Sequence, residues 1–524
     1  MTRNKRKIIW IILCCILLVI AGFFLLDRYI NKKITEALKQ LPNGIELSYS
    51  SLHSSILNSS VVIDDAVIKY SPEKNNKHQH QLQFGKISVN GIHFFKMLSK
   101  KLIINNIALD SGKITLDQYL LDKNIRLPET QSPVESLSIG ELKLNDMNAS
   151  VREGENEHAR AEGSIIVNDI RIDSLDKSFN KNNFHFEGLR CFGRTIKYII
   201  PGSYESAHIK GLELDTKKST LHVDTCKIVP ALSKTKMGEK IGHQVDYIEG
   251  SSSGIDVENL DVMQLLDKKI IADKVTIRQN KYYAFRDRRL PLDTTTKLLP
   301  VDYFKTMPFD IRIKHISTGV TNFEYEEFPK DGKETGVLKI VRLNISISPF
   351  ISHPVKGDPE YMNMKVVGSL MGSGTVSASM EFPLQKTNSY KVTGAFNELD
   401  LTTLNASAEN LGKIRIESGM LNSLSFEFTL NKEKSVGKII GEYHNLVIDK
   451  LKEKSDDKKV DKFKSFFLKH LIIPKNKDKT LDVSKRTGKV DYDHDPQRYF
   501  SYYLLHSLLM GVKSSFSLGF LLPG

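Results

Sequence analysis

The residue that most resembles a catalytic group is Ser252, at the centre of a G-x-S-x-G pattern from Gly250 to Gly254. In hydrolases this pattern places a nucleophilic serine at a sharp turn between a strand and a helix. Here Ile255 and Val257 follow with the alternation of a strand, so the required helix is not predicted. We interpret the match as chance and expect no catalytic residues and no enzymatic activity.

A possible metal site is the acidic group Asp491, Asp493, His494 and Asp495 near the C-terminus. Carboxylates bind hard cations, but these lack the spacing of an EF-hand loop. Asp495 stands directly before a proline, which is the pattern of a helix N-cap followed by Pro at the first helical position. We therefore expect a helix start here and no metal.

The remaining ligand-type side chains do not form a recognised motif. His78 and His80 lie in a polar run and are expected to be solvated. The sequence contains no P-loop, no C-x-x-C and no H-E-x-x-H pattern. We expect no cofactor. Cys191 and Cys226 could pair or could remain small buried thiols, and the sequence leaves both alternatives open.

The composition narrows the class of protein further. The chain has 524 residues, a mean hydropathy of -0.27 and four cysteines, which argues against a polytopic membrane protein and a disulfide scaffold. Its net charge is +13, from 75 basic and 62 acidic residues. The basic residues accompany no nucleic-acid-binding motif, so we expect a lysine-rich solvated surface and no nucleic-acid partner.

An uncharged apolar segment from Ile8 to Leu26, with Trp10 inside it, indicates a membrane anchor. A helix of this length spans about 28 Å, enough to cross a bilayer core. The basic residues before it keep residues 1–7 in the cytoplasm. A cleaved signal peptide is the alternative, but the apolar run is long and no clean cleavage site follows. Residues 27–44 then form a linker with a short amphipathic helix.

From residue 45 to 449 short runs alternate between apolar and polar residues, which predicts a β-rich body. Several runs repeat a pattern of apolar pairs separated by breaks, notably 101–116, 136–151, 310–325 and 412–428. The odd step from Ile104 to Ile107 predicts a bulge at Asn105 and Asn106 that keeps both on one face. Gly112, Gly319 and Gly419 are expected where the chain bends or reverses.

These repeats predict one meandering antiparallel sheet with a single apolar face. The residues assigned to that face are Ile104, Leu109, Ile114, Leu116, Leu142, Leu144, Ile414 and Ile416. An apolar face of this size cannot stay in water. It could close on itself, stack as sandwiches, curl around its apolar side, or bind an apolar ligand. The lack of obvious linkers favours one curled sheet.

The anchor and the β runs together resemble the AsmA-like family of Gram-negative envelope proteins, particularly members of the Bacteroidetes type. The resemblance is carried by the segments 45–68, 85–94, 396–405, 414–428, 437–448 and 486–519. It is weak from 176 to 308, where an insertion and divergent strands are the alternatives. The resemblance implies an elongated repeating β-groove and a role in outer-membrane biogenesis and phospholipid transport, without catalytic residues.

With this resemblance, we expect an inner-membrane protein with its bulk in the periplasm that carries phospholipid along the groove. The alternative is a periplasmic scaffold that assists outer-membrane assembly factors. Residues 450–524 are expected to form a linker and short amphipathic helices. One would cover 460–471, and two alternatives stay open for it: a helix on a membrane surface and a helix that caps the open end of the sheet. The other would run from Gln497 to Met510 and end at Gly511, with an apolar stripe of Tyr499, Tyr503, Leu504 and Leu508 packed on the sheet.

Overall fold

A computed structural model describes residues 44–71, 78–97, 99–122, 134–173, 183–385, 389–451, 460–461 and 486–515, together with a few positions between 28 and 41. Among these residues no helix is long and apolar enough to cross a membrane. The predicted anchor at 8–26, most of the linker helix and the predicted helix at 460–471 lie outside the described residues.

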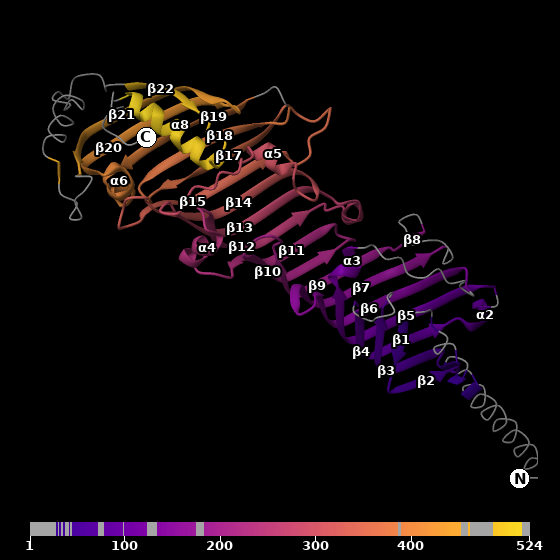
Figure 1. The fold of residues 1–524 in the computed structure, drawn as a ribbon. Coiled ribbons are helices and arrows are strands. Elements are labelled where there is room, and N and C mark those ends of the chain that lie inside the picture. The colour runs from indigo at the N-terminus through magenta and orange to yellow at the C-terminus, as the bar shows by residue number, and fades with distance from the viewer. Residues whose placement is uncertain are drawn as a thin grey trace, which may run out of the picture. The chain divides into compact units, whose positions relative to one another are not determined.

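The protein is mainly β, with 63% strand and 14% helix, as the alternating sequence predicted. The described strands belong to one large sheet that is not closed on itself, and neighbouring strands in the chain pair with one another almost throughout (Figure 1). The strands are β1 (Ile45–Ser48), β2 (Ser51–Ser55), β3 (Ser60–Tyr70), β4 (His80–Ile92), β5 (Lys101–Asp117), β6 (Ser136–Glu153), β7 (Asn156–Ile172), β8 (Phe184–His185), β9 (Gly188–Ile199), β10 (Glu205–Asp215), β11 (Thr220–Pro230), β12 (Asp246–Glu258), β13 (Lys269–Asp287), β14 (Asp310–Phe328), β15 (Gly336–Ser348), β16 (Phe350–Ile351), β17 (Tyr361–Leu370), β18 (Gly374–Pro383), β19 (Tyr390–Asp400), β20 (Ile414–Leu430), β21 (Lys434–Lys450) and β22 (Arg486–Asp493).

Most of the described helices are short and lie in connections between strands, whereas α8, of 16 residues, follows the last described strand. They are α2 (Phe94–Met97), α3 (Gln118–Asp122), α4 (Lys234–Ile241), η1 (Val262–Asp267), α5 (Pro300–Phe304), η2 (Leu401–Leu404), α6 (Asn405–Gly412) and α8 (Phe500–Ser515). The chain divides into two compact units. The first contains residues 1–201 and 207–218, and the second contains 202–206 and 219–524.

The prediction of an antiparallel sheet is wrong, because among the described strands each unit contains one parallel pair. β5 pairs parallel with β6, and β13 pairs parallel with β14. Parallel neighbours cannot be joined by a hairpin, so the chain must return along the full strand length between them. The second crossover, residues 288–309, contains α5. The alternating pattern indicates strands but carries no information on their relative direction.

The two parallel pairs share the same local geometry where they begin. The residues before β5 and β13, Lys100 and Lys268, have φ of 57° and 56°. The Lys100 carbonyl accepts from Ser136 N and the Lys268 carbonyl from Asp310 N, the first residues of β6 and β14. The same local geometry therefore opens each parallel pair.

Irregular positions in the long strands keep the apolar residues on one face. Asp169 in β7 has φ of 53°, and Val167 and Ile170 on either side of it pack in the same hydrophobic cluster despite their odd spacing. The bulge predicted at Asn105 and Asn106 is not seen as a register shift between β4 and β5. The irregular backbone lies opposite Asn105, at Gly91 of β4, which has φ of 69° and leaves room for the Asn105 side chain. Ser111 of β5, with φ of 54°, marks a second break between Leu109 and Ile114.

The glycine prediction is only partly right. Gly112 and Gly319 lie inside β5 and β14 and do not reverse the chain, although Gly319 lies where the β14–β15 register shifts. A Cβ on Gly112 would lie 2.1 Å from Met147 Sδ, and one on Gly319 would lie 2.2 Å from the Arg278 carbonyl oxygen. Both glycines therefore permit close packing. Gly419, where the β20–β21 register shifts, does mark an irregularity.

Helix α8 packs on the sheet as predicted but has different ends. Asp495 Oδ1 accepts from Gln497 N, and the helix begins three residues later, at Phe500. It continues through Gly511 to Ser515. A Cβ on Gly488 of β22 would lie 1.9 Å from the Gly511 carbonyl oxygen. The prediction that Gly511 ends the helix is wrong, because this glycine lets the helix approach the strand.

Candidate apolar binding face

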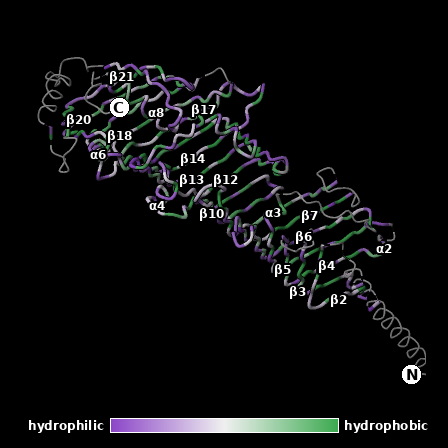
Figure 2. Tube along the Cα trace, in the orientation of Figure 1, coloured by the Kyte–Doolittle hydropathy of each residue, from purple (hydrophilic) through white to green (hydrophobic). Residues whose placement is uncertain are grey.

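The first unit presents continuous apolar rows that cross its strands at right angles. Directly paired residues share a face of a sheet, so each row can be followed through the strand register. One row joins Val61, Val89, Ile107, Leu142, Val167 and Leu189, and the next joins Ile63, Ile87, Leu109, Leu144, Ile165 and Cys191. A third joins Leu47, Ile68, Leu82, Ile114, Ala149, Ala161 and Ile196. Apolar residues recur along the strands of both units (Figure 2).

Six of the eight predicted face residues lie in these strands, on β5 and β6. Ile104 is buried, and Leu109, Ile114, Leu116, Leu142 and Leu144 are half-buried. Between residues 44 and 201 the described helices are α2 and α3, of four and five residues, which contact β5 and β6. Large aliphatic side chains along the middle rows therefore keep part of their surface accessible.

Between the second and third rows lies a tightly packed row of Ala66, Phe84, Gly112 and Met147. Phe84 is 5% exposed and Met147 is 8% exposed. The thioether of Met147 occupies the space that a side chain on Gly112 would need. This row coincides with the break at Ser111, so burial is deepest where the strands are irregular.

In the second unit the corresponding face is filled by protein. A row joins Ile316, Ile347, Met364, Met380, Val392 and Phe428. All of these residues except Ile316 belong to one hydrophobic core or pack against it. This filled core also contains Leu299 and Val301 of the crossover and Tyr503 of α8. Figure 1 shows α8 lying across the C-terminal strands.

Aromatic rings and hydrogen bonds tighten this filled core. Phe426 packs against Phe396 and Phe428 at centroid distances of 5.7 and 6.2 Å. The Tyr390 hydroxyl accepts from Val301 N at 3.1 Å, which ties the crossover to β19. Ser435 and Ser507, both fully buried, join β21 to α8 through an Oγ–Oγ contact of 2.7 Å.

The two remaining predicted face residues, Ile414 and Ile416, lie on β20 of the second unit. Ile416 is 7% exposed and packs with Tyr443 and Leu446, next to residues of η2 and α6. The structure thus does not place them with the six residues of β5 and β6, and Ile416 contacts protein.

A polar row that the sequence did not reveal crosses β12, β13 and β14. Ser252 Oγ donates to Asn280 Oδ1 at 2.7 Å, and Asn280 Nδ2 donates to Thr321 Oγ1 at 3.0 Å. The Tyr282 hydroxyl lies 2.7 Å from Ser252 Oγ. Ser252 is therefore a buried strand residue in a hydrogen-bonded network, and the helix of a nucleophile elbow does not follow it.

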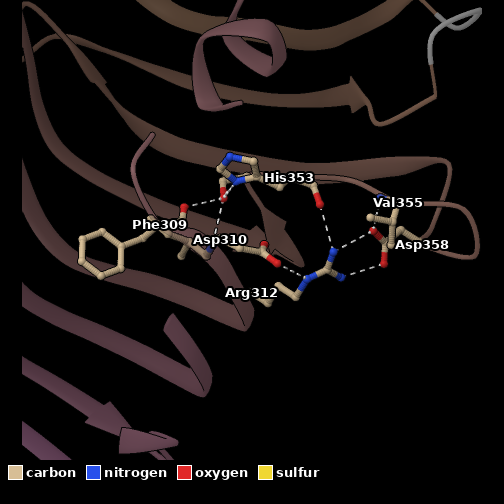
Figure 3. Close-up of polar contacts among 8 residues, drawn as sticks. Phe309, Asp310, Arg312, His353, Val355 and Asp358 are labelled. Atoms are coloured by element: carbon tan, nitrogen blue, oxygen red, sulfur yellow. Dashed lines mark hydrogen bonds and ion pairs between the residues drawn. The ribbon is translucent and has the colours of Figure 1, made fainter. Parts of the chain in front are cut away.

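A second polar cluster fixes the start of β14. Arg312 forms a bidentate ion pair with Asp358, at 2.9 and 3.3 Å, and its Nε donates to Asp310 at 3.2 Å (Figure 3). The buried Ser352 Oγ accepts from Ile311 N at 2.8 Å and lies 2.8 Å from His353 Nδ1. These contacts hold β16 and the following loop against β14, a structural role.

The other candidate ligands have protein partners. The prediction that His80 is solvated is wrong. Its Nδ1 accepts a hydrogen bond from Asp117 N at 3.0 Å, and burial lowers its pKa. His78 contacts Asp117 at 3.2 Å and stacks on Tyr119. Asp491 pairs with Lys489 and Lys434, which lowers the pKa of its carboxyl. Cys191 and Cys226 are free thiols whose pKa is raised by burial.

Comparison with known proteins adds no family assignment. No protein-family model matches this chain, and no curated protein matches it significantly.

Proposed function

We propose that this protein carries phospholipid, with acyl chains held on the apolar rows of the first unit. The carrying observation is the uninterrupted run of aliphatic residues from β3 to β9, whose middle members remain half-buried. The apolar rows run from strand to strand, so an acyl chain could move along them while exchanging one non-directional contact for another.

The proposal extends to the form and location of the protein. The breaks at Ser111 and opposite Asn105 would curve the sheet around its apolar face, because bulges increase bending and twist. Residues 8–26 would anchor the chain in a bacterial inner membrane, with the units in the periplasm. The residues of β5 and β6 are then candidate lipid contacts, whereas Ile416, packed with Tyr443 and Leu446, is a poor one.

A specific observation also favours a scaffold function for the second unit. A lipid carrier requires an open apolar path. In the second unit, however, Phe426 packs against Phe396 and Phe428 in the core that α8 covers. A filled core of this kind is suited to presenting a rigid surface to assembly factors. The two proposals assign different roles to the two units and predict different sites of lipid contact.

Site-specific photo-crosslinking separates them. Benzoylphenylalanine at Leu109 or Ile165 in the full chain should capture phospholipid from the membranes in which the protein is produced. The same group at Val392, 3% exposed in the filled core, should capture only protein. Absence of lipid at both first-unit positions, with the variants correctly folded by circular dichroism, would exclude the carrier function.

A further inference from the structure

The two margins of the apolar face in the first unit differ in chemistry. At one margin the outermost row is Leu102, Leu137, Ile172 and Phe184, and Phe186 packs beside it. At the other margin, the row begins with Ile45, Tyr70 and His80 and ends with Val151, Ala159 and Tyr198. One margin is therefore aliphatic and phenylalanine-rich. The other combines apolar residues, including Leu116 paired with Val151, with the hydroxyl groups of Tyr70 and Tyr198 and the imidazole of His80.

The polar margin offers neutral hydrogen-bond donors. His80 Nδ1 accepts from Asp117 N, so in the neutral ring the proton is on Nε2. Burial lowers the pKa of His80, which favours that neutral form. Tyr70 stacks on His80 at 6.2 Å, and Tyr198, 46% exposed, carries a hydroxyl at the far end of the row.

We propose that this Tyr70–His80–Tyr198 margin binds the acceptor oxygens of an amphiphile whose acyl chains lie on the aliphatic rows. The inference rests on the proposed lipid-carrying function and adds the orientation of the ligand. Phenol and imidazole N–H or O–H groups donate to ester, phosphate or carboxylate oxygens. Aromatic side chains with a polar end are suited to such a boundary between apolar and aqueous surroundings.

The opposite margin cannot serve the same purpose. Leu102, Leu137 and Ile172 have no polar side-chain atoms, and a polar group placed against them would lose its hydration without a hydrogen bond. An amphiphile therefore gains most when its polar end lies at Tyr70 and His80.

The second unit also has polar groups at one end of its strands. At the matching ends of β12 and β13, Arg286 and Asp246 form a bidentate ion pair at 2.6 and 2.7 Å, and Tyr499 lies over the guanidinium at 5.0 Å. In the second unit the polar group Arg286 is thus paired within the protein, with Asp246. In the first unit Tyr70 and His80 carry O–H and N–H donors, so the partner expected is a group with acceptor oxygens.

Two photoactivatable phosphatidylethanolamines test the orientation, one with a diazirine on the headgroup and one with it at the acyl terminus. The full chain is mixed with vesicles of phosphatidylethanolamine and phosphatidylglycerol containing either probe, and crosslinked peptides are mapped by mass spectrometry. We expect the head probe to label peptides with Tyr70, His80 and Tyr198. The tail probe should label those with Leu109 and Leu144.

Variants and competitors sharpen the result. Tyr70→Phe and His80→Leu should each reduce head-probe labelling of β3 and β4 about five-fold, the loss of one neutral hydrogen bond, with tail labelling kept. His93→Leu, at an exposed histidine beyond the other end of β4, is the matched control and should change neither. Competition by unlabelled palmitate, compared with unlabelled diacyl phospholipid, distinguishes a carboxylate from a phosphate or ester as the source of the oxygens.

The outcomes separate the two proposals. If the head probe labels the Leu102 and Phe184 margin, or both margins equally, the orientation is wrong while lipid binding stands. Unchanged head labelling in both Tyr70→Phe and His80→Leu would also refute it. If neither probe labels the first unit, the carrier function itself fails.

Discussion

The most informative perturbation is a carboxylate placed on the apolar face of each unit, as Leu144→Asp and Val392→Asp. Leu144 is half-buried between Leu109 and Ile165, whereas Val392 is 3% exposed between Met380 and Phe428. At Val392 the charge would be buried and unpaired, which costs several kcal/mol of a stability that is typically about 5–15 kcal/mol.

At Leu144 the expected cost is smaller. Full burial of a leucine contributes about 1.5–3 kcal/mol, and a side chain that keeps part of its surface accessible forfeits only part of that. The new carboxylate can turn toward water on the same side. We therefore expect Leu144→Asp to cost about 1–2 kcal/mol, to remain folded and to lose bound phospholipid.

Hydrogen exchange by mass spectrometry on the full chain measures each unit separately, and lipid extraction measures the ligand. Ala108→Asp is the matched control, since Ala108 lies on the other face of β5, opposite Lys143. It should preserve both exchange and lipid. Collapse of protection across the first unit in Leu144→Asp, as severe as that of the second unit in Val392→Asp, would show that the face is a closed core and refute the reasoning.

Three further predictions address the framework. Gly319→Ala should destabilise the second unit by about 1–3 kcal/mol in urea unfolding, because its Cβ would lie 2.2 Å from the Arg278 carbonyl oxygen. Gly441→Ala, whose nearest contact is a leucine methyl at 3.3 Å, should cost much less, and equal costs would contradict the packing argument. Ser435→Cys with Ser507→Cys should form a disulfide that holds α8 on β21, since the two Oγ atoms lie 2.7 Å apart; two persistently free thiols under oxidising conditions, counted by mass spectrometry, would show that α8 lies elsewhere. The hydrogen bond from His222 to Asp256 raises the pKa of His222 above its ordinary 6.5, so its stabilising effect is complete below pH 6.5 and is lost as the pH rises through the raised value. Amide exchange in β11 and β12, corrected for the intrinsic pH dependence, should quicken over that window, and His222→Gln should abolish the change.

Local sequence carried much of the secondary structure. Period-2 alternation predicted the strands because one face of a sheet is apolar and the other polar. The odd step between Ile104 and Ile107 predicted an irregularity, and the structure has one opposite Asn105. Asp495 caps the chain before α8 because a short carboxylate reaches backbone N–H groups two residues on. Each of these effects acts over a few neighbouring residues.

Strand direction and the filling of the core depend on residues far apart in the chain. β5 and β6 have patterns compatible with either direction, and the crossover between them decides for parallel pairing. Gly511 has the sequence pattern of a helix end, yet α8 continues through it because Gly488 and Gly511 permit close contact. Leu144 and Phe428 have similar surroundings in sequence. Phe428 belongs to a filled core because residues of α5 and α8 pack on its face of the sheet. Leu144 stays half-buried because, among the described residues, no such helix packs on it. The burial of a residue is set by what packs on its face and not by the local sequence pattern.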